Sequence, residues 1–222
     1  MSVSIIIPLY NQKEYISDCI ESVLSQTIPP LEIIVVDDGS TDGSGLIAEG
    51  YKEQGIKVIH QVNKGLAPAR NTGIMNSHGD YIFFLDSDDM LEENAIEILQ
   101  EAIDDFKTDI IAPSFKEFGI SNRTVVLSPT ITLEMFKDGL NYLPYFCAFR
   151  KSKLLEVGGY SPRMIFGYED LHLTINLLSR GATIKTLSDI LVLYRTKENS
   201  MIHEAQAHHE ELMAQIHKDF NI

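Results

Sequence analysis

Hydrophobic and polar positions follow two alternating patterns along the first half of the chain. Nearly continuous apolar runs predict buried strands at residues 3–9, 31–40, 56–61 and 80–85. Between these runs, apolar positions recur with the spacing of one helical face. The predicted helices are residues 12–26, 42–55, 67–78 and 92–106. Strands and helices therefore alternate, which predicts an α/β fold with a parallel sheet and helices on both of its faces.

Polar side chains follow the predicted strands at the points where the apolar runs end. They are Tyr10 and Asn11, Asp37 and Asp38, Asn63 and Lys64, and Asp86 and Asp88. Ligands of such sheets bind outside the carboxyl ends of the strands. We therefore expect these side chains to line one crevice that is rich in carboxylates.

After about residue 113 the alternation fades. The predicted elements there are a hairpin at 114–129, a short helix at 132–140, a strand followed by a helix at 145–160, a helix at 170–181, a strand at 183–195 and a polar helix from 203 onward. No segment has the length or composition of a linker, so we predict that residues 1–222 form one domain.

The composition is typical of a soluble globular protein, with 44% hydrophobic and 23% charged residues. The apolar runs are too short to span a membrane, and no secretory leader is evident. We therefore predict a cytoplasmic protein, with peripheral association at the inner face of a membrane left open. Cys19 and Cys147 are predicted to pack in the core in a reducing compartment.

The formal net charge of -14 and a pI near 4.8 exclude the basic surface that a nucleic-acid partner requires. A phosphorylated ligand would have to arrive together with a cation. The sequence does not predict an oligomeric state.

The segment IFFLDSDD, residues 82–89, concentrates this negative charge. In an extended chain Asp86 and Asp88 project to the same side, and Ser87 projects to the other. Two carboxylates about 5 Å apart repel by roughly 3 kcal/mol at an effective dielectric constant of 20. A divalent cation such as Mg²⁺ or Mn²⁺, or a sugar hydroxyl, would offset that cost. Asp89 is predicted to cap the helix that follows.

Motifs in an ordered series resemble the family 2 glycosyltransferases. They are PLYNQKEYISDCIESVLSQT, IIVVDDGSTDGS, NKGLAPARNTGI, GDYIFFLDSDD and GYEDLHL. The resemblance implies the GT-A fold, a Rossmann-like and mostly parallel central sheet with a smaller, mixed acceptor-side half. Residues 1–113 would bind a nucleotide-diphosphate sugar, 114–202 would face the acceptor, and 203–222 would form a C-terminal helix.

The resemblance assigns the nucleobase pocket to the segment around Pro8, Tyr10 and Asn11. Asp38 matches the aspartate that accepts a hydrogen bond from a base N–H. Asp37 would support the turn instead.

The resemblance also divides the roles of the aspartates after the fourth strand. Asp86 matches the first aspartate of a DxD motif, on the ribose side of the nucleotide, and Asp88 matches the metal ligand. Ser87 and Gly65 complete the predicted donor site. Arg70 would brace the carboxylates or the donor, and a structural ion pair across the crevice is an equal alternative.

In GYEDLHL, acidity at a helix start is by itself ordinary, because carboxylates there are stabilised by the helix dipole. The resemblance makes Asp170 the candidate general base, and Glu169 would orient the acceptor or the base. In the closing segment YRTKENSMIH, Arg195 would neutralise the leaving group and His203 would approach the phosphate or the metal.

The remaining histidines and aromatic residues receive structural or acceptor-side assignments. His172 is predicted to pack or to lie on the surface. His208, His209 and His217 are predicted to be solvated. Since the chain has no tryptophan, an aromatic acceptor platform would come from Tyr160, Phe166 or Tyr168.

The predicted function is metal-dependent, inverting transfer of a sugar from a nucleotide-diphosphate donor, with a uridine diphosphate sugar as the default donor. The acceptor would be a hydroxyl of a glycan or lipid-linked molecule, as in polysaccharide biosynthesis. A non-catalytic nucleotide-sugar binder and a haloacid-dehalogenase-like phosphatase are the alternatives. A response-regulator receiver fits less well, because IIVVDDGS lies on the second strand rather than the first.

Overall fold

The computed structural model describes residues 1–103, 107–198 and 205–220. Its first half contains β1 (Val3–Leu9), α1 (Ile16–Leu24), β2 (Glu32–Asp37), α2 (Ser44–Glu49), η1 (Lys52–Gln54), β3 (Ile56–His60), α3 (Leu66–Asn76), β4 (Tyr81–Phe84), β5 (Met90–Leu91) and α4 (Ala95–Ala102). Its second half contains β6 (Ile110–Gly119), β7 (Thr124–Val125), η2 (Leu133–Asp138), β8 (Ala148–Arg150), α5 (Lys151–Val157), α6 (Glu169–Ser179), β9 (Ile184–Thr196) and α8 (His209–Phe220).

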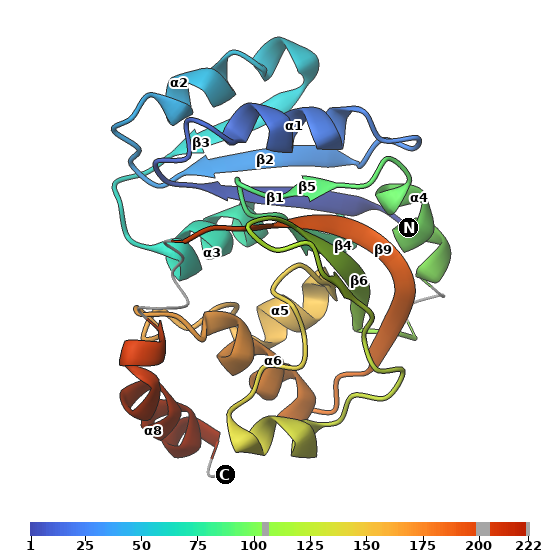
Figure 1. Ribbon diagram of the computed structural model, residues 1–222, viewed down its shortest axis with the longest axis vertical. Helices are drawn as coiled ribbons and strands as arrows, with labels where there is room; N and C mark the ends of the chain where they lie inside the picture. Colours follow the sequence, from blue (N-terminus) through green and yellow to red (C-terminus); the bar gives the residue numbers. More distant parts are fainter. Residues whose placement is uncertain (104–106, 199–204, 221–222) are drawn as a thin grey trace.

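The strands of the described residues form one curled, mixed sheet of nine strands, with β7 beside β6 and the others in the order β3-β2-β1-β4-β8-β6-β9-β5 (Figure 1). β1 to β4 are parallel to one another, as the first half of the sequence predicts. β8 then lies antiparallel between β4 and β6. The α/β class, with a parallel first half and a mixed second half, is therefore confirmed.

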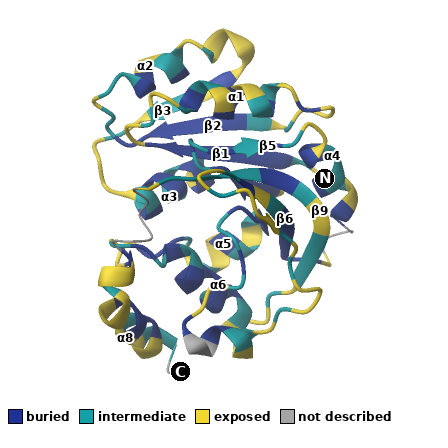
Figure 2. Ribbon diagram, viewed as in Figure 1, coloured by how far each residue is buried: buried dark blue, intermediate teal, exposed yellow. Residues whose placement is uncertain are grey.

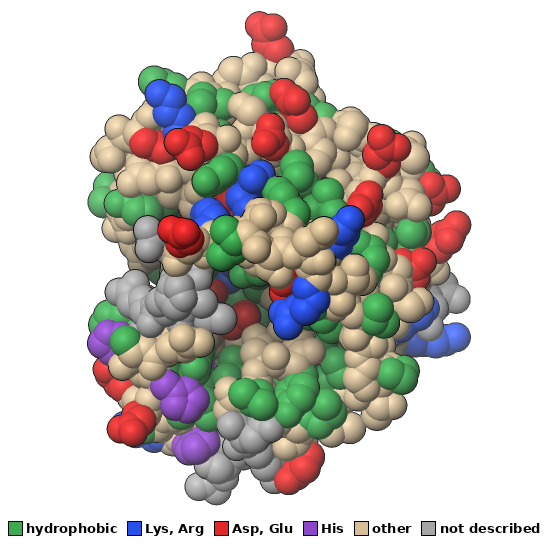
Figure 3. Space-filling model, in the orientation of Figure 1, with side chains coloured by type: hydrophobic (Ala, Val, Ile, Leu, Met, Phe, Trp, Pro, Cys, Tyr) green, Lys and Arg blue, Asp and Glu red, His purple; other side chains and the backbone are tan. Residues whose placement is uncertain are grey.

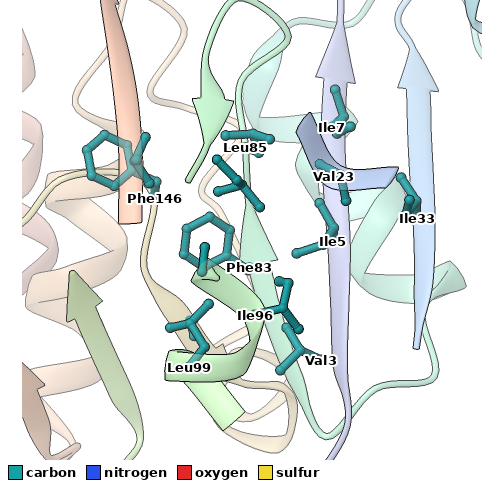
Figure 4. Close-up of a cluster of buried hydrophobic side chains, with 14 of the residues drawn as sticks. Val3, Ile5, Ile7, Val23, Ile33, Phe83, Leu85, Ile96, Leu99 and Phe146 are labelled. Carbon is teal, nitrogen blue, oxygen red and sulfur yellow. The ribbon is translucent and has the colours of Figure 1, made fainter. Parts of the chain in front are cut away.

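Alternate residues of the central strands face two separate cores. Ile5 and Phe83 point into the core beneath α1 and α4, where Figure 4 shows them beside Val23 and Ile96. Ile6, the neighbour of Ile5, instead joins the core that includes α3, α5 and α6. Fully burying one aliphatic side chain contributes about 1.5–3 kcal/mol. Figure 2 shows the resulting arrangement, a buried sheet with helices whose outer surfaces are exposed.

Several predicted element bounds are wrong. The helix predicted at 42–55 divides into α2 and η1, with Gly50 between them and Gly55, at φ 89°, at the end. The helix predicted at 92–106 begins at Ala95, and its residues 104–106 lie outside the described part. β5 escaped prediction because a two-residue strand has no hydrophobic period, and it forms only by pairing with β9.

The second half matches its predicted pattern more closely. β6 and β7 form the expected hairpin, and α5, α6 and β9 occupy the predicted segments. Gly181, at φ 80°, follows the end of α6. Both cysteines are buried and unpaired, as predicted. Across the described residues, no helix is long and apolar enough to cross a membrane.

Candidate active site

The carboxyl ends of β1 to β4 meet at one edge of the sheet, because these strands are parallel. Figure 3 shows a hollow between the sheet and the helices of the second half, with acidic side chains in its depth and basic side chains near its rim. The predicted crevice thus lies where the two halves of the chain meet.

The end of β1 is joined to the loop after β2. Pro8 is buried within β1, whereas Tyr10 beyond the strand is 48% exposed. Asn11 has a left-handed φ of 51°, and its side-chain oxygen accepts a hydrogen bond from the Thr41 backbone N–H at 2.8 Å. The Asn11 N–H donates to Ser40 at 3.1 Å. Asn11 therefore ties the end of β1 to the loop after β2, and its contact with a base stays a prediction.

Asp37 and Asp38 follow β2 and have different local partners. Asp37 accepts a hydrogen bond from the Ser40 N–H at 3.0 Å, so it supports the turn as predicted. Asp38 is 3% exposed and accepts from the backbone N–H groups of Lys64 and Gly65 and from the side chain of Gln61. These bonds hold the exposed Gly65, at φ 94°, against Asp38. The N–H of a bound nucleobase would have to share the Asp38 carboxylate with these donors from the loop after β3.

Arg70 connects the two acidic motifs. Its Nη2 lies 2.8 Å from Asp86 Oδ1 and its Nη1 lies 2.6 Å from Glu169 Oε1. The guanidinium is 1% exposed and lies between the rings of Tyr145 and Tyr160, 5.0 and 5.2 Å from their centroids. Arg70 therefore forms an ion pair with Asp86 in the first half of the chain and another with Glu169 in the second half, and its contact with a donor stays a prediction.

Asp86 retains 26% of its side-chain exposure. Burial raises the pKa of Asp86 to about 6, Arg70 opposes that rise and the charge of Asp88 adds to it. The carboxylate therefore depends on Arg70 to remain ionised at neutral pH.

The segment after β4 is a turn and not the extended chain that was predicted. β4 ends at Phe84, and the Asp89 N–H donates to the Asp86 carbonyl at 3.0 Å. Asp86 and Asp88 nevertheless keep partly exposed carboxylates, whereas Ser87 between them is 4% exposed.

Asp89 does not cap a helix, because α4 begins after Asn94. The Asp89 side chain accepts hydrogen bonds from the Tyr145 hydroxyl and, at 2.6 Å, from the Arg195 backbone N–H. The capping prediction was wrong because the chain turns after Asp86, which directs Asp89 into the protein, where it is 1% exposed.

The end of β9 lies beside residues 86–89, the aspartate turn. Arg195 donates from Nε to the Asp88 carbonyl at 2.8 Å, and its guanidinium stacks between Tyr15 and Phe118. Lys197, two residues later, places its Nζ 2.5 Å from Asp88 Oδ2. Lys197 was not predicted as a site residue, although it follows Arg195 by two positions just beyond the end of β9, a spacing that places side chains on the same side of a strand. Tyr145 was not predicted either, because no local pattern indicates its contacts.

Asp170 lies in the first turn of α6, next to Glu169. Its Oδ2 accepts a hydrogen bond from Asn141 Nδ2 at 2.8 Å. Burial, and then the charge of Glu169, raise the pKa of Asp170 to about 7, while Arg70 opposes this rise. A carboxylate in this state exchanges a proton near neutral pH, as a general base must.

Two of the tail histidines contact the loop before Glu169, although only His208 is more buried than predicted and His209 is exposed as predicted. His208 stacks on Phe166 with the ring centroids 3.8 Å apart, and His209 Nδ1 lies 2.8 Å from the Tyr168 hydroxyl. These contacts dock the tail on the loop before Glu169.

The other histidines match their predictions or lie outside the described residues. His172 packs as predicted, 5% exposed and 3.1 Å from Asp219 of α8. His217 is exposed as predicted, and His203 lies outside the described residues. Tyr160, at 1% exposure, is too buried to form an acceptor platform.

The sequence profile described as Glycosyl transferase family 2 matches residues 4–167, which include the strand ends and Arg70 but stop before Glu169. The uncharacterized glycosyltransferase EpsJ of Bacillus subtilis is 34% identical over 220 residues, covering 90% of this chain and 62% of EpsJ. The glycosyltransferase GlyG of Streptococcus pneumoniae is 31% identical over 221 residues, covering 90% of this chain and 72% of GlyG. This chain thus spans less than two thirds of the length of EpsJ.

Solved structures show the same fold. TarS of S. aureus in complex with UDP-GlcNAc superimposes with a TM-score of 0.79 at 24% identity, over 91% of this chain and 61% of that one. Together with the profile match over most of the sequence, these similarities show that the chain belongs to glycosyl transferase family 2.

Proposed function

We propose that the protein is a metal-dependent, inverting glycosyltransferase that moves a sugar from a nucleotide-diphosphate donor to an acceptor hydroxyl. The observation that carries this proposal is Arg70, which ties Asp86 of the donor side to Glu169, the neighbour of Asp170. One buried guanidinium thereby sets the position of the donor carboxylates relative to the candidate base. In this proposal residues 1–113 form the donor half and residues 114–202 the acceptor half.

The donor site lies along the strand ends, where Tyr10, Asn11, Asp38 and Gly65 surround the place of the base. A uridine nucleotide is the proposed donor, supported by the solved complexes of the TarS neighbours with UDP and UDP-GlcNAc. The acceptor would be a glycan or lipid-linked hydroxyl.

Asp88 is the proposed ligand for Mg²⁺ or Mn²⁺. It presents a partly exposed carboxylate that already holds a cationic group, the Lys197 ammonium. Within the described ranges, no cluster of three or more potential metal-ligating side chains occurs. Such a site fits a hard cation that binds one carboxylate together with the phosphates of a nucleotide. When bound, the ion would supply Lewis-acid stabilisation of the leaving diphosphate.

Asp170 would remove the proton of the acceptor hydroxyl, which then attacks the anomeric carbon from the face opposite the leaving group. Attack from that side inverts the configuration, so an α-linked donor would give a β-linked product. Asn141 Nδ2 and the Leu171 backbone N–H would hold Oδ2 and Oδ1 of Asp170, each at 2.8 Å, and the remaining lone pairs of the carboxylate would receive the acceptor hydroxyl. The catalytic role is favoured over a non-catalytic binder because Arg70 joins Asp86 to Glu169, the neighbour of Asp170.

The phosphatase alternative is set aside, because the chain belongs to family 2. In addition, Asp86, its would-be nucleophile, is held by Arg70.

Donor binding is tested by thermal unfolding with a panel of nucleotide sugars, each with and without Mn²⁺. A matching donor at about 100 times its Kd should stabilise the fold by about 2.7 kcal/mol, which raises Tm by roughly 5–10 °C. The Asp88→Ala variant should lose the Mn²⁺-dependent part of that rise. Asp189→Ala, which removes an exposed carboxylate on β9, is the control and should keep it. A stabilisation that does not change with Mn²⁺ in the wild type would contradict metal dependence.

The rate of transfer should rise as the pH increases through about 7. Asp170 must be ionised to accept a proton, and kcat/KM reports the ionisation of the free enzyme. In Glu169→Gln the neighbouring negative charge is gone, which stabilises ionised Asp170. We expect the acid limb of the pH profile of kcat/KM to shift to lower pH by about one unit.

The matched control for this pH profile is Glu101→Gln, which removes an exposed carboxylate from α4. Its acid limb should coincide with that of the wild type. A limb that stays in place in Glu169→Gln would show that Asp170 is not the titrating group.

A further inference from the structure

Lys197 is held at the aspartate turn by several contacts. Its Nζ lies 2.5 Å from Asp88 Oδ2, 4.9 Å from the centroid of the Tyr15 ring and 3.4 Å from Gln12 Oε1. The Lys197 side chain is 25% exposed. The position is therefore defined but not closed off from solvent.

The aspartates of this turn differ in how firmly their partners are held by the fold. Asp86 is paired with the guanidinium of Arg70, which is 1% exposed. Asp89 is bound by a tyrosine hydroxyl and a backbone N–H. Asp88 is instead paired with the end of a long, flexible and partly exposed side chain. Of these aspartates, Asp88 is the one whose partner can leave without opening the core.

The Lys197 side chain has space next to the turn into which it can move when it leaves Asp88. A cavity of about 450 Å³ is lined by Tyr15, Ile120, Arg195 and Lys197 among other residues. It opens widely, so the ammonium can leave Asp88 and remain solvated. Lysine suits such a role because its charge is a compact point on a flexible stem, with no fixed fork geometry.

We propose that Lys197 is a competing cation that neutralises Asp88 in the metal-free protein and must leave before a divalent ion binds there. This inference rests on the proposed role of Asp88. An ammonium and a divalent ion repel each other at a shared carboxylate, so Lys197 lowers the affinity for free metal. A nucleoside diphosphate brings negative charge that offers the displaced ammonium a new partner. Metal and nucleotide binding are thereby coupled, and the protein takes up the ion together with the diphosphate.

The experiment is a calorimetric titration of Mn²⁺ into the full chain, with and without saturating UDP. In Lys197→Met without UDP, we expect Mn²⁺ to bind about tenfold more tightly than in the wild type, a difference of about 1.4 kcal/mol. With UDP present, the two affinities should converge. The factor by which UDP strengthens Mn²⁺ binding should therefore fall about tenfold in the variant.

Two further variants serve as controls. Lys153→Met removes an ammonium that lies 2.9 Å from Glu156 on α5, remote from the turn, and should bind Mn²⁺ as the wild type does. Lys197→Arg keeps the positive charge and should also keep the weak affinity for free Mn²⁺.

The outcomes separate this inference from the proposed function. If UDP-dependent Mn²⁺ binding is present but Lys197→Met binds free Mn²⁺ no more tightly than the wild type, the competing-cation role is overturned and the proposed function stands. If neither protein binds Mn²⁺ even with UDP, the proposed metal site of Asp88 fails, and the inference fails with it.

Discussion

Replacing Asp170 with asparagine should reduce the turnover of sugar transfer by about 10³-fold, within the 10²–10⁴-fold range of general-base catalysis. Asparagine has nearly the same shape and can still accept the hydrogen bond from Asn141, but it cannot take a proton. The fold and the binding of the donor should therefore remain unchanged. The measurement is steady-state turnover with saturating donor and acceptor, together with the Kd of UDP.

The matched control is Asp80→Asn, which alters an exposed carboxylate at the start of β4 that is hydrogen-bonded to Ser2. This change lies at the opposite end of the strand from Asp86, so turnover should be unaffected. A turnover of Asp170→Asn within about tenfold of the wild type would show that another group, or water, accepts the proton.

Replacing Arg70 with methionine should lower the free energy of unfolding by about 3–5 kcal/mol at pH 7. The change leaves Asp86 and Glu169 facing each other without the guanidinium that lies 2.8 and 2.6 Å from them. Loss of Arg70 also raises the pKa of Asp86 further, because in the wild type Arg70 opposes the effect of burial on that pKa. The penalty should therefore shrink as the pH falls from 7 to about 6, because Asp86 of the variant takes up its proton above the wild-type pKa. Urea unfolding at pH 7 and pH 5 measures both effects.

The control for Arg70 is Arg163→Met. Arg163 also pairs with a carboxylate, at 2.8 Å from Asp219, but its side chain is 58% exposed, so the pair contributes no more than about 1 kcal/mol. The double variant Arg70→Met with Glu169→Gln should recover part of the loss, because one of the two stranded charges is then absent. Equal destabilisation by Arg70→Met and Arg163→Met would contradict a buried, bridging role for Arg70.

Much of the fold could be predicted from local patterns. The helix around Cys19 has an apolar period that only a helix satisfies, and the apolar run at 3–9 has the length of a buried strand. The predicted bounds were less accurate where tertiary pairing decides them, as for β5, which forms only beside β9. The prediction that His208 is solvated was wrong for a similar reason, because its stacking partner, Phe166, belongs to a loop that is distant in the sequence.

The sequence alone determined the α/β class and the gathering of Asn11, Asp38, Asp86 and Asp88 at one edge of the sheet. It could do so because side-chain periods reflect local geometry, and parallel strands bring their carboxyl ends together.

Only the tertiary structure decided which charges meet. Arg70 and Glu169 are 99 residues apart in the chain. Lys197 reaches Asp88 because β9 ends beside the turn after β4. An ion pair depends on distance in space and on burial, and both are set by how the second half of the chain folds over the first, which no local pattern records.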